Sequence, residues 1–300
     1  MPPATACAPT EARSISMCVR RVPPKSCSIS KVAVPVSVAR CANPAVARTA
    51  RRSPQSHNSL MPLGFLTLRI PKIRSQIIVH SGNITKDYGN GVVVQHKGFV
   101  NASSALDTMI ERFPNTTQLV VAGSSAGSFP TPVFAAMAGD QLPNADLKVF
   151  ADSSGAVPDA MGFVVGNWGT LETLPDWPEI EGLTVDQFTP AYTFIKAAEH
   201  NPKITFLRHD YAFDPVLSQF AQMAGLSPDN LVSVMRTNES KIEATGANVA
   251  NWISPGAEHT IAVRDELYTE EMNGVRFIDW LTAFVNGKPE DDNYCVDCAE

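Results

Sequence analysis

The sequence lacks any long hydrophobic run and any overall excess of positive charge. No stretch approaches the roughly 18 consecutive apolar residues that a membrane-spanning helix needs, which argues against a transmembrane protein. Its 24 basic and 30 acidic residues give a net charge of −6. This balance argues against nucleic acid as the main partner, because phosphate neutralisation needs clustered lysine and arginine. With 44% hydrophobic residues, the 300-residue chain has ample apolar side chains for a core.

Acidic residues are nearly absent from residues 1–86, which hold only Glu11 against thirteen basic residues, a net charge of +12. The remainder carries 11 basic and 29 acidic residues, a net charge of −18. Such asymmetry indicates two regions within one chain. We place the boundary at residue 78 and predict a low-complexity basic segment over residues 1–78 and a folded domain over residues 79–300.

The first sixty residues also lack helical or strand periodicity and are rich in alanine, serine, proline and arginine. Two interpretations stay open: an organelle transit peptide, or a disordered tail that does not belong to the domain. The segment is a poor secretory signal, because its longest apolar stretch, residues 32–39, lies too far from Met1. Neither interpretation lets it fold as part of the core.

Cysteine is absent between residues 42 and 294, and the domain has only Cys295 and Cys298 at its end. A zinc site would need a second pair or histidines at ligand spacing, and His259 is the only histidine after His209. We therefore expect no metal. A terminal disulfide and two free thiols are the open alternatives, and a redox role is not expected on an acidic tail.

From residue 79 onward, short apolar or β-branched runs alternate with longer stretches of helical period, which is typical of parallel strands with crossover helices. The predicted strands are residues 91–95, 118–122, 147–151, 204–207 and 249–253. The predicted helices are residues 102–112, 125–138, 184–200, 215–224 and 268–286. We expect an α/β fold with a mostly parallel sheet and flanking helices. The intervening Gly-, Pro- and Trp-rich residues 155–182 form either a lid over the site or a surface loop packed on its own aromatics.

The clearest chemical signal is a G-x-S-x-G motif, Gly123 to Gly127, which follows a β-run and precedes a helical stretch of small residues. In a nucleophile elbow the serine lies on a tight strand-to-helix turn with its hydroxyl exposed, and the flanking glycines allow the close approach of strand and helix. Ser125 is the predicted nucleophile. The backbone N–H of Ala126 is the predicted oxyanion donor.

An acid and then a histidine follow in the chain order of an α/β-hydrolase triad. The strand at residues 204–207 leads to Asp214, and the strand at residues 249–253 leads to His259 on a Pro-Gly loop. His259 would take the serine proton, and Asp214 would orient the imidazole. Asp210 and Asp152 are the weaker alternatives for the acid.

Each of these residues also has a purely structural interpretation. Asp214, directly before Pro215, has the sequence of a plain helix cap. Asp210 fits a turn, and His209 fits a solvated loop side chain.

Several motifs occur together and in order: residues 79–82, 98–101, 123–127, 151–155, 213–214, 255–260 and 273–275, Trp280, Cys295 and Cys298. In this combination the chain resembles the pectin acetylesterase and Notum family over residues 79–298. The resemblance implies an α/β-hydrolase-type serine esterase, largely secreted, that removes acyl groups from cell-wall polysaccharide or, in Notum, a lipid acyl group from a signalling protein. It places Ser125, Asp214 and His259 on the family's catalytic triad, with no metal or organic cofactor.

The chain departs from that family before residue 79. The family has a strand ending in a Gly-Gly-Gly turn that completes the oxyanion hole, whereas this sequence has residues 68–78 there and no triple glycine. The first strands of the family fold are expected to be missing. Two functions follow: a serine esterase that deacylates, by family analogy, an acetylated carbohydrate such as pectin, or a non-catalytic remnant that binds or is inactive. Localisation is expected to be secreted, with organelle targeting through the basic segment as the alternative.

Overall fold

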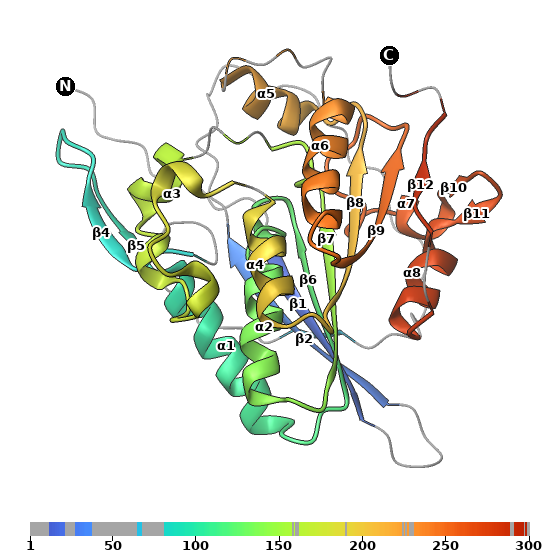
Figure 1. Cartoon of the computed structure of the whole chain (residues 1–300), viewed down its shortest axis with the longest axis horizontal. Coiled ribbons are helices and arrows are strands. Elements are labelled where there is room, and N and C mark those ends of the chain that lie inside the picture. Colours follow the sequence, from blue (N-terminus) through green and yellow to red (C-terminus); the bar gives the residue numbers. More distant parts are fainter. Residues whose placement is uncertain are drawn as a thin grey trace, which may run out of the picture.

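The computed structural model describes the backbone of residues 12–21, 28–37 and 65–67, and residues 81–300 except 158, 160–161, 190, 224, 226, 228–230, 289–290, 297 and 299–300; the side chains of residues 162–164 are also outside the description. The fold is α/β, and five parallel strands with flanking helices form its centre (Figure 1). The parallel strands are β6 (Gln118–Ser124), β7 (Asp146–Asp152), β8 (Thr205–Tyr211), β9 (Asn248–Ser254) and β12 (Asn293–Tyr294). They lie in the order β12-β9-β8-β7-β6. The predicted fold class is confirmed.

The helices cover both faces of this sheet (Figure 1). They are α1 (Gly98–Arg112), α2 (Thr131–Gln141), α3 (Gly162–Trp168), α4 (Tyr192–His200), α5 (Pro215–Met223), α6 (Leu231–Glu243), α7 (Glu266–Thr269) and α8 (Phe277–Val285). One face packs α1, α2 and α4 against Val149 and Phe206, and the other packs α8 against Phe150 and Leu207. Neighbouring strand residues thus enter opposite cores, as the period of two in a strand requires.

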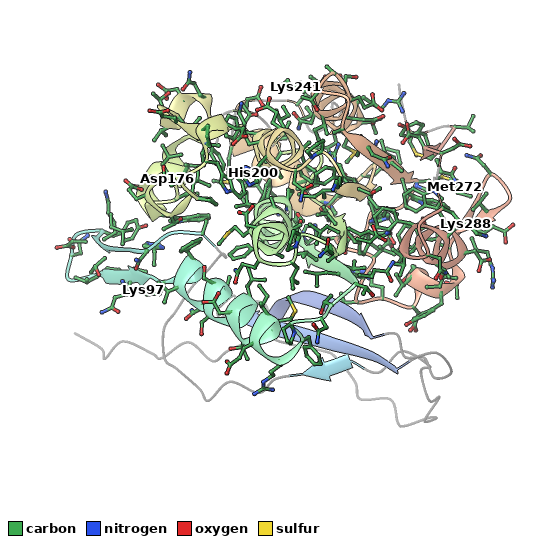
Figure 2. The ribbon with its side chains drawn as sticks, turned by 60° about the horizontal axis from the view of Figure 1, so that its bottom comes forward. Lys97, Asp176, His200, Lys241, Met272 and Lys288 are labelled. Atoms are coloured by element: carbon green, nitrogen blue, oxygen red, sulfur yellow. A yellow bond between two sulfur atoms is a disulfide. The ribbon has the colours of Figure 1, made fainter. Side chains whose placement is uncertain are left out.

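The segment between α3 and α4 is tied to the helical layer at His200, the last residue of α4. Its ring stacks on Trp177 with centroids 4.0 Å apart, and its Nε2 lies 2.8 Å from Asp140 Oδ1 on α2. Figure 2 labels His200 among the side chains that fill this layer. Trp177 is buried in the core formed by α1, α2 and α4, so this part of residues 155–182 packs on the domain.

Four predicted elements differ from the structure. The helix predicted at 184–200 is a 3₁₀ helix, η5 (Val185–Gln187), followed by α4 only from Tyr192, and the helix predicted at 125–138 is a 3₁₀ helix at 125–127 followed by α2 from Thr131. The run at residues 91–95 does not join the parallel sheet; β5 (Val93–His96) pairs antiparallel with β4 (Ile84–Asp87) in a separate hairpin. Gly89, Asn90 and Gly91 have positive φ and form its turn, a signal that favours a hairpin. The predicted helix at 268–286 is divided into α7 and α8 by the strands β10 (Glu271–Met272) and β11 (Val275–Arg276).

Three more strands come from the basic segment. β1 (Ala12–Arg21) pairs antiparallel with β6 and with β2 (Ser28–Ser37), and β2 pairs with β3 (Phe65–Thr67). The backbone of these stretches departs from the expectation of a segment without structure. All other residues of 1–78 lie outside the described part of the chain, and the boundary at residue 78 stays a prediction.

Among the described residues, no helix combines the length and the apolar composition that crossing a membrane requires. At the other end of the chain, Cys295 and Cys298 form a disulfide, one of the two alternatives left open by the sequence.

Candidate active site

The G-x-S-x-G motif forms the predicted strand-to-helix turn. Strand β6 ends at Ser124, and a short 3₁₀ helix, η2 (Ser125–Gly127), follows directly. Ser125 has φ of 57°, a left-handed conformation that residues with a Cβ adopt only at a cost of order 1–3 kcal/mol. A Cβ on Gly123 would lie 2.0 Å from the carbonyl oxygen of Gly127, so only glycine fits there. The first glycine of the motif therefore lets the chain turn back on itself.

The structure brings Ser125, His259 and Asp214 into one hydrogen-bonded chain. His259 Nε2 lies 2.7 Å from Ser125 Oγ, and His259 Nδ1 lies 2.6 Å from Asp214 Oδ2. His259 and Asp214 are buried, whereas Ser125 is partly exposed. The three residues follow β6, β8 and β9 at the carboxyl ends of the parallel strands, where ligands of open α/β sheets bind.

Asp214 serves as a helix cap and as the histidine's partner at once. Its Oδ1 accepts the backbone N–H groups of Val216 at 2.8 Å and Leu217 at 3.1 Å, at the start of α5. This leaves Oδ2 for His259. The capping interpretation and the triad interpretation of this residue are therefore compatible, because one carboxylate oxygen accepts the backbone N–H groups of α5 and the other contacts His259.

The alternative acids point elsewhere. Asp210 Oδ1 accepts the backbone N–H of Gly155 at 2.7 Å, and its Oδ2 lies 3.9 Å from the Arg208 guanidinium. Burial raises the pKa of Asp210 to about 6, although Arg208 and the Gly155 N–H act in the opposite direction. Asp152 Oδ1 lies 3.0 Å from His209 Nδ1. Among the described side chains, neither carboxylate contacts His259.

His209 is not the solvated loop residue that its sequence context suggested. It lies within β8, is fully buried, and places its Nε2 2.9 Å from Ser254 Oγ. The predicted strand ended at residue 207, four residues before the end of β8, because the polar run at residues 208–210 was taken for a loop. Those polar side chains are buried in the sheet and paired with one another and with neighbouring strands.

Ala126, the predicted oxyanion donor, is the second residue of η2 and directly follows Ser125. Ala126 is partly exposed and lies in the same turn as Ser125. The first N–H groups of a helical turn have no partner within the turn, so they are available to an oxygen atom that becomes negatively charged.

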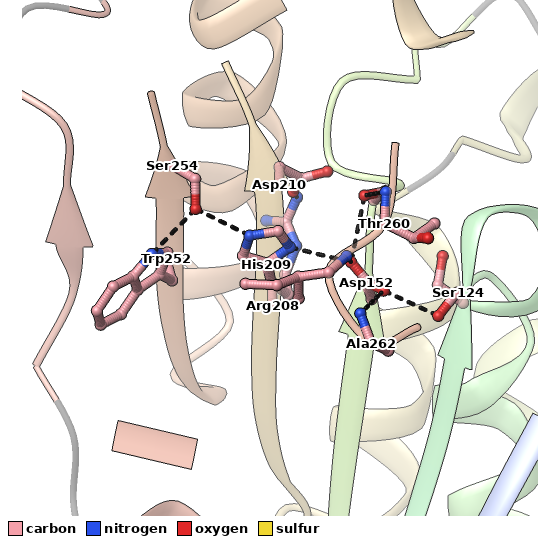
Figure 3. A network of polar contacts seen from close by, with 12 residues as sticks. Ser124, Asp152, Arg208, His209, Asp210, Trp252, Ser254, Thr260 and Ala262 are labelled. Carbon is pink, nitrogen blue, oxygen red and sulfur yellow. Dashed lines mark hydrogen bonds and ion pairs between the residues drawn. The ribbon is translucent and has the colours of Figure 1, made fainter. Parts of the chain in front are cut away.

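Sequence reasoning missed a second polar network beneath this site (Figure 3). The parallel registers place Ser124, Asp152, His209 and Trp252 side by side across four adjacent strands. Ser124 Oγ donates to Asp152 at 2.8 Å. Each of these residues stands at or near the carboxyl end of its strand, and that shared position is the sequence signal that would have found the network.

One group of carboxylates has the spacing of metal ligands. Glu239, Glu243 and Asp292 have oxygens within 4.8 Å of one another. Tyr294 OH donates to Glu239, and the Asn251 backbone N–H donates to Asp292 at 2.7 Å. Two of the three carboxylates thus already have protein partners, and the group gives no reason to assign a metal.

Compared with known proteins, the chain matches no family model and no curated protein.

Proposed function

We propose that this chain is a serine esterase of the α/β-hydrolase type, similar to pectin acetylesterases and Notum, that removes an acyl group, acetyl by family analogy, from a carbohydrate ester. The observation that carries the proposal is the hydrogen-bonded chain from Ser125 through His259 to Asp214. Its members come from three separate strand ends, and a serine, a histidine and a buried carboxylate in this order form the constellation that activates a serine hydroxyl.

The proposed reaction has two steps. Ser125 Oγ attacks the ester carbonyl while His259 Nε2 accepts its proton, and the Ala126 N–H stabilises the negative oxygen of the tetrahedral intermediate. His259 then gives the proton to the departing alcohol, and an acyl-enzyme on Ser125 remains. Water attacks this ester with His259 again as base, which releases the carboxylic acid and restores the serine. The sequence of steps uses no metal or organic cofactor.

Asp214 is assigned the role of orienting His259. Its carboxylate fixes Nδ1 as the protonated nitrogen and thereby leaves Nε2 free to accept the serine proton. It also stabilises the imidazolium that forms during each step.

Secretion is the matching proposal for localisation. The disulfide between Cys295 and Cys298 supports it, since disulfides persist in oxidising compartments. Organelle targeting through the basic first segment is the alternative.

Acetate release tests the proposal. The purified chain, incubated with acetylated pectin and separately with p-nitrophenyl acetate, should release acetate, and Ser125→Ala should release none above background. Ser128→Ala is the matched control, because Ser128 lies one turn further on and is fully buried. Among the described residues, its hydroxyl donates to the Ser125 carbonyl alone. Turnover that survives in Ser125→Ala contradicts the esterase function.

A second candidate is a non-catalytic member of the same fold, and one observation favours it. The sequence has no triple glycine to complete the oxyanion hole, and removing one oxyanion donor costs on the order of 10²–10³ in turnover. Binding of acetylated pectin without acetate release would favour this candidate.

A further inference from the structure

Asp152 lies at the carboxyl end of β7, between the strands that lead to Ser125 and to Asp214. Its side chain is fully buried and accepts hydrogen bonds on both oxygens (Figure 3). Ser124, the residue before the nucleophile, donates its hydroxyl to Oδ2 at 2.8 Å. Two backbone groups that follow His259 also donate to this carboxylate: Ile261 N–H to Oδ1 and Ala262 N–H to Oδ2, each at 3.0 Å.

The segment after His259 depends on this anchor, because it has left strand β9 and has no ladder of its own. Thr260 N–H donates to Ser153 Oγ at 2.9 Å, so three consecutive backbone N–H groups end on residues 152 and 153. Thr260 has φ of 72° and Ser153 has φ of 60°. Such left-handed conformations persist only where surrounding contacts hold them.

A buried carboxylate needs compensation for lost hydration, and the hydrogen bond of His209 is the largest single contribution. Burial by itself raises the pKa of Asp152, but the hydrogen bond and charge of His209 and the N–H groups of Ala262 and Ile261 outweigh burial, and the pKa lies below its ordinary value. The ionised carboxylate is an acceptor only, so His209 donates from Nδ1. His209 in turn is fixed by Ser254 at the end of β9.

We propose that Asp152 is a positioning residue for the esterase reaction: it joins the turn that carries Ser125 to the segment that follows His259, and so keeps nucleophile and base at hydrogen-bond distance. The proposal rests on the proposed function. Asp152 touches neither Ser125 nor His259 in the described contacts and acts through the backbone of residues 260–262 and through Ser124.

The test is Asp152→Asn in the full-length chain. The amide has nearly the shape of the carboxylate, but one of its two positions now donates where Ser124, Ser153, His209 and two backbone N–H groups also donate. We expect His259 to shift, and the second-order rate of fluorophosphonate labelling at Ser125 to fall about 10²-fold, as small misplacements of catalytic groups do. With p-nitrophenyl acetate, kcat should fall and KM should stay near the wild-type value.

Asp210→Asn is the matched control. It removes a buried carboxylate from the neighbouring strand β8, at a residue that binds Gly155 and Arg208 and not the segment after His259. It should label within a factor of a few of the wild-type rate. Thermal unfolding of both variants gives the temperature below which each is folded, and rates are compared there, since loss of stability alone leaves the labelling rate of folded molecules unchanged.

Amide hydrogen exchange separates positioning from other effects of Asp152. Exchange at residues 260–262 should speed up in Asp152→Asn and remain slow in Asp210→Asn. Slow labelling with unchanged exchange at residues 260–262 overturns the positioning role. If Asp152→Asn does not fold, Ser153→Ala decides: it removes the Thr260 acceptor and the hydroxyl that donates to Asp152 Oδ1 at 3.2 Å, and should slow labelling several-fold and raise exchange at Thr260. Wild-type rates in that variant overturn the proposal.

The outcomes for the two proposals are distinct. A wild-type protein inert to the fluorophosphonate overturns the esterase function and, with it, the role of Asp152. A reactive wild type with an equally reactive Asp152→Asn overturns only the role of Asp152.

Discussion

At the scale of single residues, Asp214 shows how one side chain serves structure and chemistry together. One carboxylate oxygen caps α5 and the other meets His259, so the cap fixes the orientation of the carboxylate. With only one of these hydrogen-bonded oxygens, the Asp214 carboxylate would be free to rotate. The proposed orienting role follows from this double attachment.

Replacing Asp214 with asparagine should lower esterase turnover by roughly 10⁴, because loss of the orienting carboxylate leaves the histidine in the wrong tautomer. Asparagine keeps an oxygen for the helix cap, so α5 should remain in place. Steady-state kcat on p-nitrophenyl acetate is the measurement. Asp210→Asn should cost tenfold or less, and the reverse ranking of the two variants would assign the acid to Asp210.

The raised pKa of Asp210 leads to a prediction about how stability depends on pH. Burial raises its pKa to about 6 from 3.8, so the folded state binds its proton more tightly than the unfolded state does. The stability gained in this way is complete below pH 3.8 and is lost as the pH rises through about 6. Asparagine does not titrate. The unfolding free energy of the wild type relative to Asp210→Asn should therefore fall, by up to about 3 kcal/mol, as the pH rises over that interval. Urea unfolding across that range measures it, and a flat or rising difference contradicts it.

The sequence was sufficient to predict Ser125, Asp214 and His259 as a group, because each follows a strand and carries a type of side chain that the chemistry needs. It was insufficient for Asp152 and His209. Their roles depend on the register of parallel strands, which aligns residues 57 positions apart, whereas the sequence indicates only that each residue lies near the end of a strand.

At the scale of elements, the turn from β6 into η2 places the candidate nucleophile. A Cβ at Gly123 would meet the Gly127 carbonyl at 2.0 Å and a Thr131 methyl at 2.9 Å. Backbone atoms cannot yield as a flexible side chain does, so the elbow depends on this glycine. The helix that follows begins only at Thr131, because η2 and a further turn intervene.

Gly123→Ala should open this turn, with reduced stability and little or no fluorophosphonate labelling, since overpacking against backbone costs about 1–3 kcal/mol or more. The matched control is Gly166→Ala in α3, where a Cβ would meet only Val185 at 3.8 Å, an ordinary contact. Gly166→Ala should label like wild type. Thermal unfolding and labelling, measured on both variants, check the prediction, and it is wrong if Gly123→Ala labels at the wild-type rate.

Elements with strong periodicity were predicted from the sequence, and those set by tertiary contacts were not. Strands β6 to β9 and helix α1 match their predicted positions to within a few residues. Helix α6 was not predicted. Its buried face includes the polar residues Asn238 and Glu239, whose side chains form hydrogen bonds with residues outside the helix. These polar residues interrupt the apolar stripe by which an amphipathic helix is recognised in a sequence. The hairpin β10-β11 has an Asn273-Gly274 turn, both residues with positive φ, and the helix predicted at 268–286 overlooked this hairpin signal.

At the scale of the whole molecule, the parallel sheet gathers residues from distant parts of the sequence at one edge. Ser125 and His259 lie 134 positions apart and meet because β6, β8 and β9 all end on the same side. A parallel sheet with crossover helices was predictable from the alternation of short apolar runs and helical stretches. The pairing of β1 with β6 was not, since the basic composition of residues 1–86 favours an unfolded chain.

The most direct test of the central claim, that Ser125 is an activated nucleophile, is fluorophosphonate labelling of the full-length protein followed by peptide mass spectrometry. Only an activated serine reacts quickly, because its hydroxyl must lose a proton to a neighbouring base as it attacks. The account predicts a single adduct on Ser125, none in Ser125→Ala, and strongly reduced labelling in a His259 variant. No adduct on the folded protein, or an adduct on a different serine, would contradict it.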